Sequence, residues 1–178
     1  EFEELLITSK LTGKYNFSNI GAAIAIGKHF GISNDNVKKG IEDYIPQNNR
    51  SQIQRTAKNT LIVDTYNANP SSMEQAVLNF KDFPADHKWV IIGDMFEMGE
   101  YEMEEHQKIA LLSTQQSFEK VILVGEAFGK VALNANPEIL QFKSTDHLIE
   151  YLQANQPLQK TILLKGSRGM KLERAIDL

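Results

Sequence analysis

The stretch that decides the fold is Leu-Ile-Val-Asp-Thr-Tyr-Asn-Ala-Asn-Pro-Ser-Ser-Met at residues 61–73. Its three leading apolar residues, two of them β-branched, predict a buried strand that ends on a carboxylate. A polar run and Pro70 follow, and a helical pattern then begins. Ligands of open α/β sheets bind beyond the carboxyl ends of the strands. We therefore predict a binding site here that includes Asp64, Tyr66, Asn67 and Asn69. For the aspartate, the alternative is a plain cap at the end of the strand.

From about residue 52 onward, strand-like and helix-like patterns alternate. Strands are expected near residues 53–56, 61–64, 89–93, 121–125, 139–142 and 161–165. Helices are expected near residues 71–81, 101–116, 127–134, 145–154 and 170–177. This alternation predicts an α/β domain with a Rossmann-like, mostly parallel sheet and helices on both faces. The first two strands have no helix between them, so Lys58-Asn59 is expected to turn a hairpin.

The first part of the chain has a different pattern. A short strand is expected at residues 5–8, and a helix rich in small residues at 20–30, with Asn19 as its N-cap and Gly31 just past its end. A second helix is expected to start at Ser33 or Asn34, because apolar residues then recur at helical spacing.

One strand and two helices cannot enclose a core. We therefore expect residues 1–46 to be the end of a larger domain whose beginning is absent. The polar, helix-breaking residues 47–51 are expected to be a linker. Residues 52–178 are then expected to be a complete α/β domain.

The composition excludes several classes of function. The 178 residues are 42% hydrophobic and 24% charged, an ordinary globular composition with a net charge of −4. No run of Lys and Arg suggests a nucleic-acid partner. Cysteine is absent, so neither a disulfide framework nor thiol chemistry is available. The longest apolar runs are far shorter than the roughly 20 residues of a membrane helix, and no signal-peptide pattern opens the chain.

Common catalytic and cofactor motifs are also missing from the sequence. It contains no phosphate-binding loop of the type G-x-x-x-x-G-K-[ST], no G-x-G-x-x-G and no G-x-S-x-G. Nicotinamide or flavin binding and hydrolase chemistry are therefore disfavoured. The histidines are scattered without zinc-ligand spacing, so no metal site is expected, and each is interpreted as a surface or capping residue. They are His29, His87, His106 and His147.

A second candidate site is the turn Lys-Gly-Ser-Arg-Gly at residues 165–169, which follows an expected strand and precedes an expected helix. Free N–H groups at a helix start attract anions, and an arginine can grip a carboxylate with two parallel hydrogen bonds. Lys165, Ser167 and Arg168 are therefore candidates for binding a small carboxylate or phosphate. The alternative is a glycine-rich turn whose charges are simply solvated.

Three further charged residues are candidates on weaker grounds. Arg50 lies in the expected linker, where it is either solvated or able to reach a nucleotide's phosphates across a domain seam. Asp94 and Glu97 follow the expected strand 89–93, at another carboxyl edge of the sheet. They are candidates for substrate or metal contact. The other acids nearby crowd the first turn of a helix, where negative charge is favourable without any function.

Five motifs in this order along the chain resemble those of the Mur ligases. They are YNFSNIGAAIAI at 15–26, NNRSQ at 48–52, DTYNANPSSM at 64–73, GDMFEMG at 93–99 and KGSRGMKLE at 165–173. Within that family they are most similar to the ligases that add D-alanyl-D-alanine to the UDP-N-acetylmuramoyl tripeptide. The resemblance covers nearly the whole chain.

The resemblance implies an ATP-dependent ligase of peptidoglycan synthesis in the bacterial cytoplasm, with ATP and Mg²⁺ as cofactors, acting as a monomer. By resemblance, Asn19 would reach the adenine, Arg50 would contact ATP and Asp64 would contact its ribose. The turn at 165–169 would hold the terminal carboxylate of D-alanyl-D-alanine. The phosphate-binding loop and the UDP-binding domain of the family are absent from this sequence, so the chain alone is expected to be inactive.

Two alternatives remain at this point. A related ligase, which adds a diamino acid or glutamate to muropeptides or to folate, would share the contacts with ATP. The Asp-Asn-Pro-Arg motif of the tripeptide-forming ligase is not found. A non-catalytic α/β module that binds a small anionic metabolite would need only the turn at 165–169 and would leave Arg50 and Asp64 unused.

Overall fold

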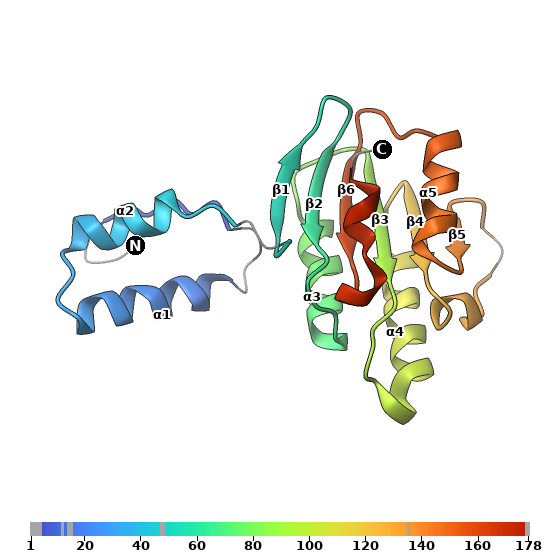
Figure 1. Cartoon of the computed structure of the whole chain (residues 1–178), viewed down its shortest axis with the longest axis horizontal. Coiled ribbons are helices and arrows are strands. Elements are labelled where there is room, and N and C mark those ends of the chain that lie inside the picture. Colours follow the sequence, from blue (N-terminus) through green and yellow to red (C-terminus); the bar gives the residue numbers. More distant parts are fainter. Residues whose placement is uncertain (1–4, 12, 14–15, 47–48, 135, 177–178) are drawn as a thin grey trace.

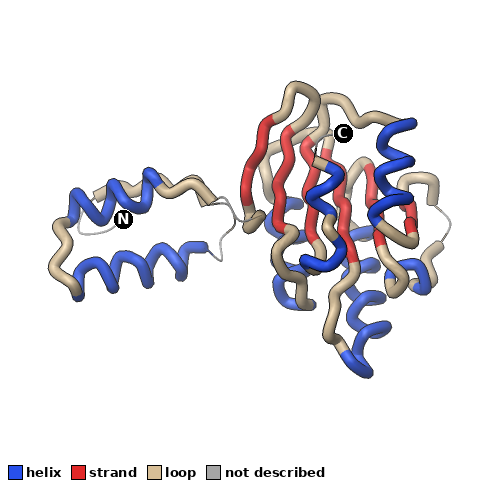
Figure 2. Tube along the Cα trace, in the orientation of Figure 1, coloured by secondary structure: helices blue, strands red, loops and turns tan. Residues whose placement is uncertain are grey.

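The computed structural model describes residues 5–11, 13, 16–46, 49–134 and 136–176. A six-stranded, mostly parallel sheet with helices on both faces forms the larger part, and two helices precede it in the chain (Figure 1). The tube trace in Figure 2 shows the strands side by side between the helices. The predicted α/β fold class is confirmed.

The sheet has the strand order β1-β2-β6-β3-β4-β5. Its strands are β1 (Gln52–Arg55), β2 (Thr60–Asp64), β3 (Lys88–Gly93), β4 (Lys120–Val124), β5 (Ile139–Phe142) and β6 (Thr161–Lys165). Strands β1 and β2 pair antiparallel, and all other neighbours pair parallel. The hairpin turn is where the sequence predicted it, since the Thr56 N–H donates to the Asn59 carbonyl at 2.9 Å.

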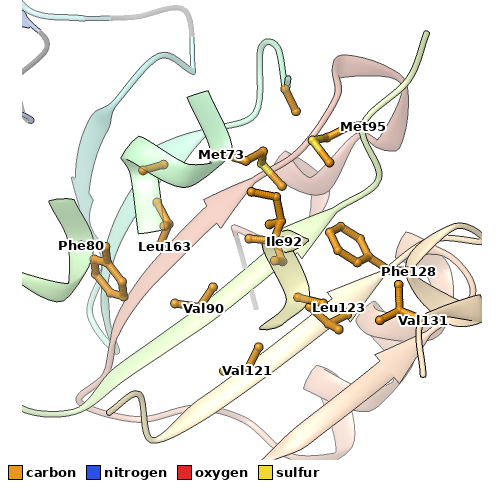
Figure 3. Close-up of a cluster of buried hydrophobic side chains, with 14 of the residues drawn as sticks. Met73, Phe80, Val90, Ile92, Met95, Val121, Leu123, Phe128, Val131 and Leu163 are labelled. Carbon is orange, nitrogen blue, oxygen red and sulfur yellow. The ribbon is translucent and has the colours of Figure 1, made fainter. Parts of the chain in front are cut away.

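Two apolar layers hold the helices on the sheet, because side chains of a strand alternate between its faces. One face carries Val90, Ile92 and Leu163 and is covered by α3 (Pro70–Lys81) and α4 (Glu102–Thr114), as Figure 3 shows for its central side chains. The opposite face is covered by α5 (Thr145–Ala154) and by the 3₁₀ segment Leu172–Ala175. The fold is therefore a three-layer α/β/α sandwich.

The strand order brings charged side chains from distant parts of the sequence together at the carboxyl edge of the sheet. Strand β6 lies between β2 and β3, and Asp64, the last residue of β2, is the register partner of Lys165, the last residue of β6. These two side chains are about 100 residues apart in the sequence, and the central position of β6 makes them neighbours. The loops that follow β2 and β6 consequently share one end of the sheet.

The two preceding helices are α1 (Asn16–His29) and α2 (Asn34–Asp43). The end of α1 is as predicted: Gly31 has a φ of +72°, and the Ile32 N–H donates to the Gly27 carbonyl at 2.9 Å, as in a left-handed helix terminus. The start of α1 differs from the prediction, because the helix already begins at Asn16. The prediction of Asn19 as the N-cap is therefore wrong.

Three predicted elements are not formed. Residues 5–8 are not a strand, since only Leu5 makes a strand-type bridge among the described residues. The predicted helix 127–134 is reduced to the 3₁₀ turn Phe128–Lys130, because the Gln141 amide donates to the Phe128 and Val131 carbonyls that a helix would use.

The predicted helix 170–177 is also wrong for the described residues, which end at 176. It is replaced by two short 3₁₀ segments, Arg168–Met170 and Leu172–Ala175. Lys171 between them has left-handed backbone angles, with a φ of 53°, so no continuous helical ladder can form.

None of the helices within the described ranges combines the length and the apolar character that crossing a bilayer requires.

Candidate functional site

A cavity of about 470 Å³ lies at the carboxyl end of β2, where the sheet meets the α1–α2 pair. Residues from helix α1, the segment before β1, the β2–α3 loop and the end of β6 line it together. Most of the residues predicted from the sequence are among them: Asn19, Arg50, Asp64, Tyr66, Asn67, Asn69 and Lys165. Ser167, Arg168, Asp94 and Glu97 do not line it.

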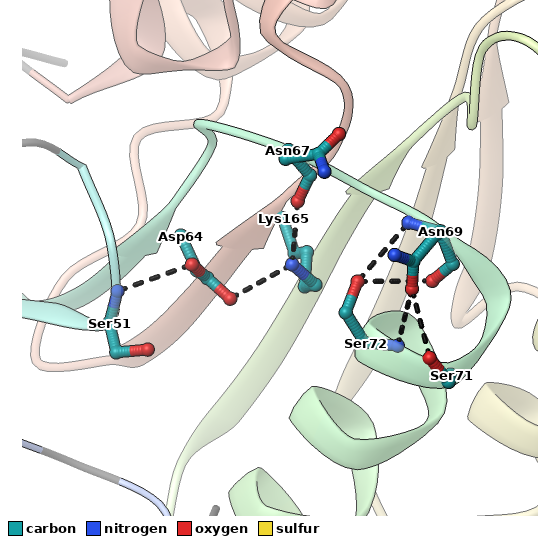
Figure 4. Close-up of polar contacts among 7 residues, drawn as sticks. All are labelled: Ser51, Asp64, Asn67, Asn69, Ser71, Ser72 and Lys165. Atoms are coloured by element: carbon teal, nitrogen blue, oxygen red, sulfur yellow. Dashed lines mark hydrogen bonds and ion pairs between the residues drawn. The ribbon is translucent and has the colours of Figure 1, made fainter. Parts of the chain in front are cut away.

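A buried ion pair forms the base of this cavity (Figure 4). The Lys165 ammonium donates to Asp64 Oδ2 at 2.9 Å and to the Asn67 carbonyl at 2.9 Å. The lysine side chain is only 2% exposed and the aspartate side chain 17%. Two of the three lysine N–H groups are therefore used within the protein. Lys165 consequently acts first on the aspartate, rather than as a free cation of the turn.

The second carboxylate oxygen of Asp64 holds the backbone that enters the sheet. The Ser51 N–H donates to Asp64 Oδ1 at 3.2 Å. Asn49 and Ser51 on either side of Arg50 both have positive φ angles, 51° and 48°. Such angles are uncommon for residues other than glycine, so this bond helps to fix a strained segment. Each carboxylate oxygen keeps further lone-pair capacity toward the cavity.

The asparagines of the β2–α3 loop also serve the fold. Asn69 caps α3: its Oδ1 accepts from the Ser72 N–H at 2.9 Å, and the Ser72 hydroxyl accepts from the Asn69 N–H. This reciprocal capping box, with Pro70 in the first turn, fixes where the helix starts. Asn67 and Tyr66 are exposed, and Asn67 contributes its carbonyl to Lys165. The cap therefore positions the loop that carries them.

The turn after β6 is built into the sheet edge. The Ser167 hydroxyl accepts from the Phe96 N–H at 2.9 Å, and the Ser167 N–H donates to the Asp94 carbonyl at 3.1 Å. A Cβ on Gly166 would lie 2.9 Å from Leu172 Cδ1 and 3.1 Å from the Gly93 Cα, so glycine is needed there. The next element is the 3₁₀ turn Arg168–Met170 rather than an α-helix, so the predicted anion attraction by a helix start does not apply.

Arginine side chains from two segments meet on one aromatic ring. The Arg50 guanidinium carbon lies 4.0 Å from the centroid of the Tyr66 ring, and that of Arg168 lies 5.4 Å from it. Both distances are within the range of cation–π attraction. Arg168 therefore borders the site through Tyr66, although it does not line the cavity itself.

Asp94 supports the neighbouring loop. This buried carboxylate accepts from the Ala127 N–H at 3.0 Å and from the Phe128 N–H at 2.9 Å. A Cβ on Gly125, which has a φ of +130°, would meet the carboxylate at 2.2 Å. The geometry thus gives Asp94 a structural role. Glu97 is exposed and has a φ of +62°.

One histidine departs from its predicted place. His106 is fully buried rather than on the surface. Its Nδ1 lies 2.7 Å from the Glu102 carbonyl, and its Nε2 accepts from the Met95 N–H at 2.9 Å. This pairing requires the neutral tautomer with the proton on Nδ1. Among the described residues, no three His, Asp or Glu side chains gather as a metal-binding group.

Sequence reasoning missed several residues that line the cavity, among them Asn16, Ser51, Ser72 and Gln75. Ser72 forms the capping box with Asn69, although the usual sequence signal for that motif is Glu or Gln at this position. Ser51 contributes through its backbone N–H, which no side-chain pattern reveals.

Comparison with known proteins decides the family. The family model described as "Mur ligase, glutamate ligase domain" matches residues 49–168. The chain belongs to the Mur ligase family. As a Mur ligase it is 28% identical, over 173 residues, to the UDP-N-acetylmuramoyl-tripeptide--D-alanyl-D-alanine ligase of Bacillus subtilis (strain 168), covering 93% of this chain and 38% of that protein. It is 33% identical over 155 residues to the ligase of the same name from Rickettsia prowazekii (strain Madrid E), covering 85% and 33%.

Solved Mur ligase structures share the fold. One crystal structure of MurF from Acinetobacter baumannii has a TM-score of 0.81 and 25% sequence identity, and covers 96% of this chain and 39% of that one. MurF from Thermotoga maritima in complex with ADP has a TM-score of 0.76 at 19% identity, covering 94% and 38%, which shows the fold alone. This Mur ligase chain therefore spans a little over a third of the length of the relatives that it matches.

Proposed function

We propose that this chain supplies the C-terminal part of an ATP-dependent ligase that joins D-alanyl-D-alanine to the UDP-N-acetylmuramoyl tripeptide. The named relatives, at 28% and 33% identity, support this substrate pair. The observation that carries the nucleotide assignment is the cavity in which Asn19, Arg50 and Asp64 come together from three separate segments. A cytoplasmic location and a role in cell-wall formation belong to the same proposal.

The reaction proposed for the complete ligase has two steps. A carboxylate oxygen of the tripeptide attacks the γ-phosphorus of ATP, and ADP leaves, which gives an acyl phosphate. The dipeptide amine then attacks the acyl carbon, the tetrahedral intermediate releases phosphate, and the nitrogen loses a proton. Binding of both substrates between domains orients the reacting atoms and excludes water.

The residues of this chain would bind rather than react. Asp64 would accept hydrogen bonds from ribose hydroxyls through its remaining lone pairs, while Lys165 and the Ser51 N–H hold its orientation. Arg50 would contact the phosphates, and Arg168 would pair with the dipeptide carboxylate. Mg²⁺, when bound, neutralises phosphate charge during transfer. Among the described residues no three acidic or histidine side chains gather around a possible Mg²⁺ position.

Replacing Asp64 tests the nucleotide assignment. In the complete ligase, Asp64→Ala should lower kcat/KM for ATP about 10–100-fold, since a hydrogen bond to a charged group contributes about 1.5–3 kcal/mol. Steady-state kinetics with varied ATP measures this. Asp86→Ala, which removes an exposed aspartate far from the cavity, is the control. Because the alanine leaves Lys165 unpaired, Asp64→Asn and a melting curve must accompany it. Unchanged ATP dependence in a variant that melts like the parent would make Asp64 purely structural.

Replacing Arg168 tests the dipeptide assignment. Arg168→Ala should raise the KM for D-alanyl-D-alanine about 10–100-fold and change that for ATP much less, because one charge-assisted contact is lost. A dipeptide with an amidated C-terminus should be a poor substrate for the parent but lose little more in the variant, because both changes remove the same contact. Arg174→Ala is the control. Additive penalties would exclude the pairing, and dipeptide binding without any nucleotide dependence would favour a non-catalytic module.

A further inference from the structure

Tyr66 occupies an unusual position, because its ring is contacted by cations from two distant parts of the chain. Arg50 precedes the sheet and Arg168 follows its last strand, yet their guanidinium carbons lie 4.0 Å and 5.4 Å from the same ring centroid. Both arginines and Tyr66 are exposed. Two like charges that contact one ring repel each other, and the attraction of each charge to the ring offsets part of that repulsion.

The backbones of both arginines are already fixed beside this ring. Arg50 lies between two residues with positive φ, and the Ser51 N–H bond to Asp64 anchors the segment. Arg168 follows Ser167, whose N–H and hydroxyl are both bonded to the loop after β3. Each long side chain therefore starts from a defined point, and the ring limits where its charged end can lie.

We propose that Tyr66 is a positioning residue that holds Arg50 and Arg168 as one cationic pair, one arginine for each of two anionic ligands. The electron-rich ring face attracts both guanidinium groups and leaves their N–H edges free to bind oxygen. On the proposed function, on which this assignment rests, the two anions are a polyphosphate and the C-terminal carboxylate of a dipeptide. The ring, rather than the phenolic hydroxyl, carries this role.

Kinetics of the complete ligase distinguish the ring from the hydroxyl. Tyr66→Leu should raise the KM for ATP and for D-alanyl-D-alanine each by about two- to fivefold, with kcat nearly retained, because cation–π contacts at exposed sites are weak. Tyr66→Phe should restore most of both affinities. Tyr101→Leu, which removes another exposed tyrosine, is the matched control. If the phenylalanine variant is as impaired as the leucine variant, the hydroxyl contacts a substrate and the proposal is overturned.

A combination of variants tests whether the ring acts through the arginines. In an Arg168→Ala background, Tyr66→Leu should raise the KM for the dipeptide no further but should still raise that for ATP. In an Arg50→Ala background, the pattern should reverse. Independent, additive losses in both backgrounds would overturn the proposal.

A nuclear magnetic resonance measurement on the 178-residue chain separates this inference from the proposed function. Side-chain protons of Arg50 and Arg168 should show ring-current shifts that Tyr66→Leu removes and Tyr66→Phe keeps. If these shifts are present while the arginine variants leave both KM values unchanged, the proposed function fails and the ring contacts stand. If the shifts are absent from both arginines, the positioning role of Tyr66 is wrong whatever the ligase does.

Discussion

Replacing Lys165 with methionine is expected to lower the free energy of unfolding by about 2–4 kcal/mol, because the Asp64 carboxylate is left without its buried partner. This loss is smaller than is usual for breaking a fully buried ion pair. The Asp64 side chain is 17% exposed, and it keeps its hydrogen bond from the Ser51 N–H. Urea denaturation measures the change. The double variant Asp64→Asn with Lys165→Met should recover much of it, because no unpaired charge then remains.

The same Lys165→Met variant discriminates between two roles at the ligand. If Lys165 orients Asp64, the variant should raise the KM for ATP more than that for D-alanyl-D-alanine. The resemblance of the turn at 165–169 to the Mur ligases implies instead that Lys165, together with Arg168, binds the dipeptide carboxylate. An increase confined to the dipeptide would restore that interpretation and contradict the role inferred from the ion pair.

Asp94→Ala is expected to lower the free energy of unfolding by about 3–5 kcal/mol. The substitution removes two charge-assisted hydrogen bonds of about 1.5–3 kcal/mol each and leaves the Ala127 and Phe128 N–H groups without their acceptor. Chemical denaturation with an unchanged slope would assign the loss to the folded state. Glu97→Ala, on an exposed carboxylate of the same loop, should change stability by no more than about 0.5 kcal/mol. If Asp94→Ala melts like the parent but ligation is lost, Asp94 contacts a ligand instead.

Strands β2, β3, β4 and β6 were predictable because each is a short, mostly apolar run bounded by polar or turn residues. Residues 61–64 show this, since they ended within one residue of the observed β2. The segment 127–134 was not predictable in the same way. Its helical pattern is overridden by the amide of Gln141 on β5, which donates to the Phe128 and Val131 carbonyls of the segment from 13 and 10 residues further along the chain. Lys171 likewise interrupts the predicted helix, because it has a positive φ angle that a lysine rarely adopts and that the sequence therefore does not predict.

The location of the site was predictable from the sequence, but the contacts between its side chains were not. Asp64 and its neighbours follow a strand, and that alone placed them at the carboxyl edge. The pairing of Asp64 with Lys165 depends on the insertion of β6 between β2 and β3, and no local pattern encodes strand order. The meeting of Arg50 and Arg168 on Tyr66 depends on the same insertion.

The central place of β6 in the sheet also determines when the sheet can be completed during synthesis on the ribosome. Strand β6 is the last of the six to be synthesised, yet within the described part of the chain it alone joins the β1–β2 hairpin to the β3–β4–β5 group. Thr60 of β2 can pair with Thr161 of β6 only after about a hundred more residues have been synthesised. Until then, β2 and β3 each present an unpaired edge, a risk for wrong pairing with other chains. This strand order therefore requires that the two parts of the sheet join late, after β6 has been synthesised.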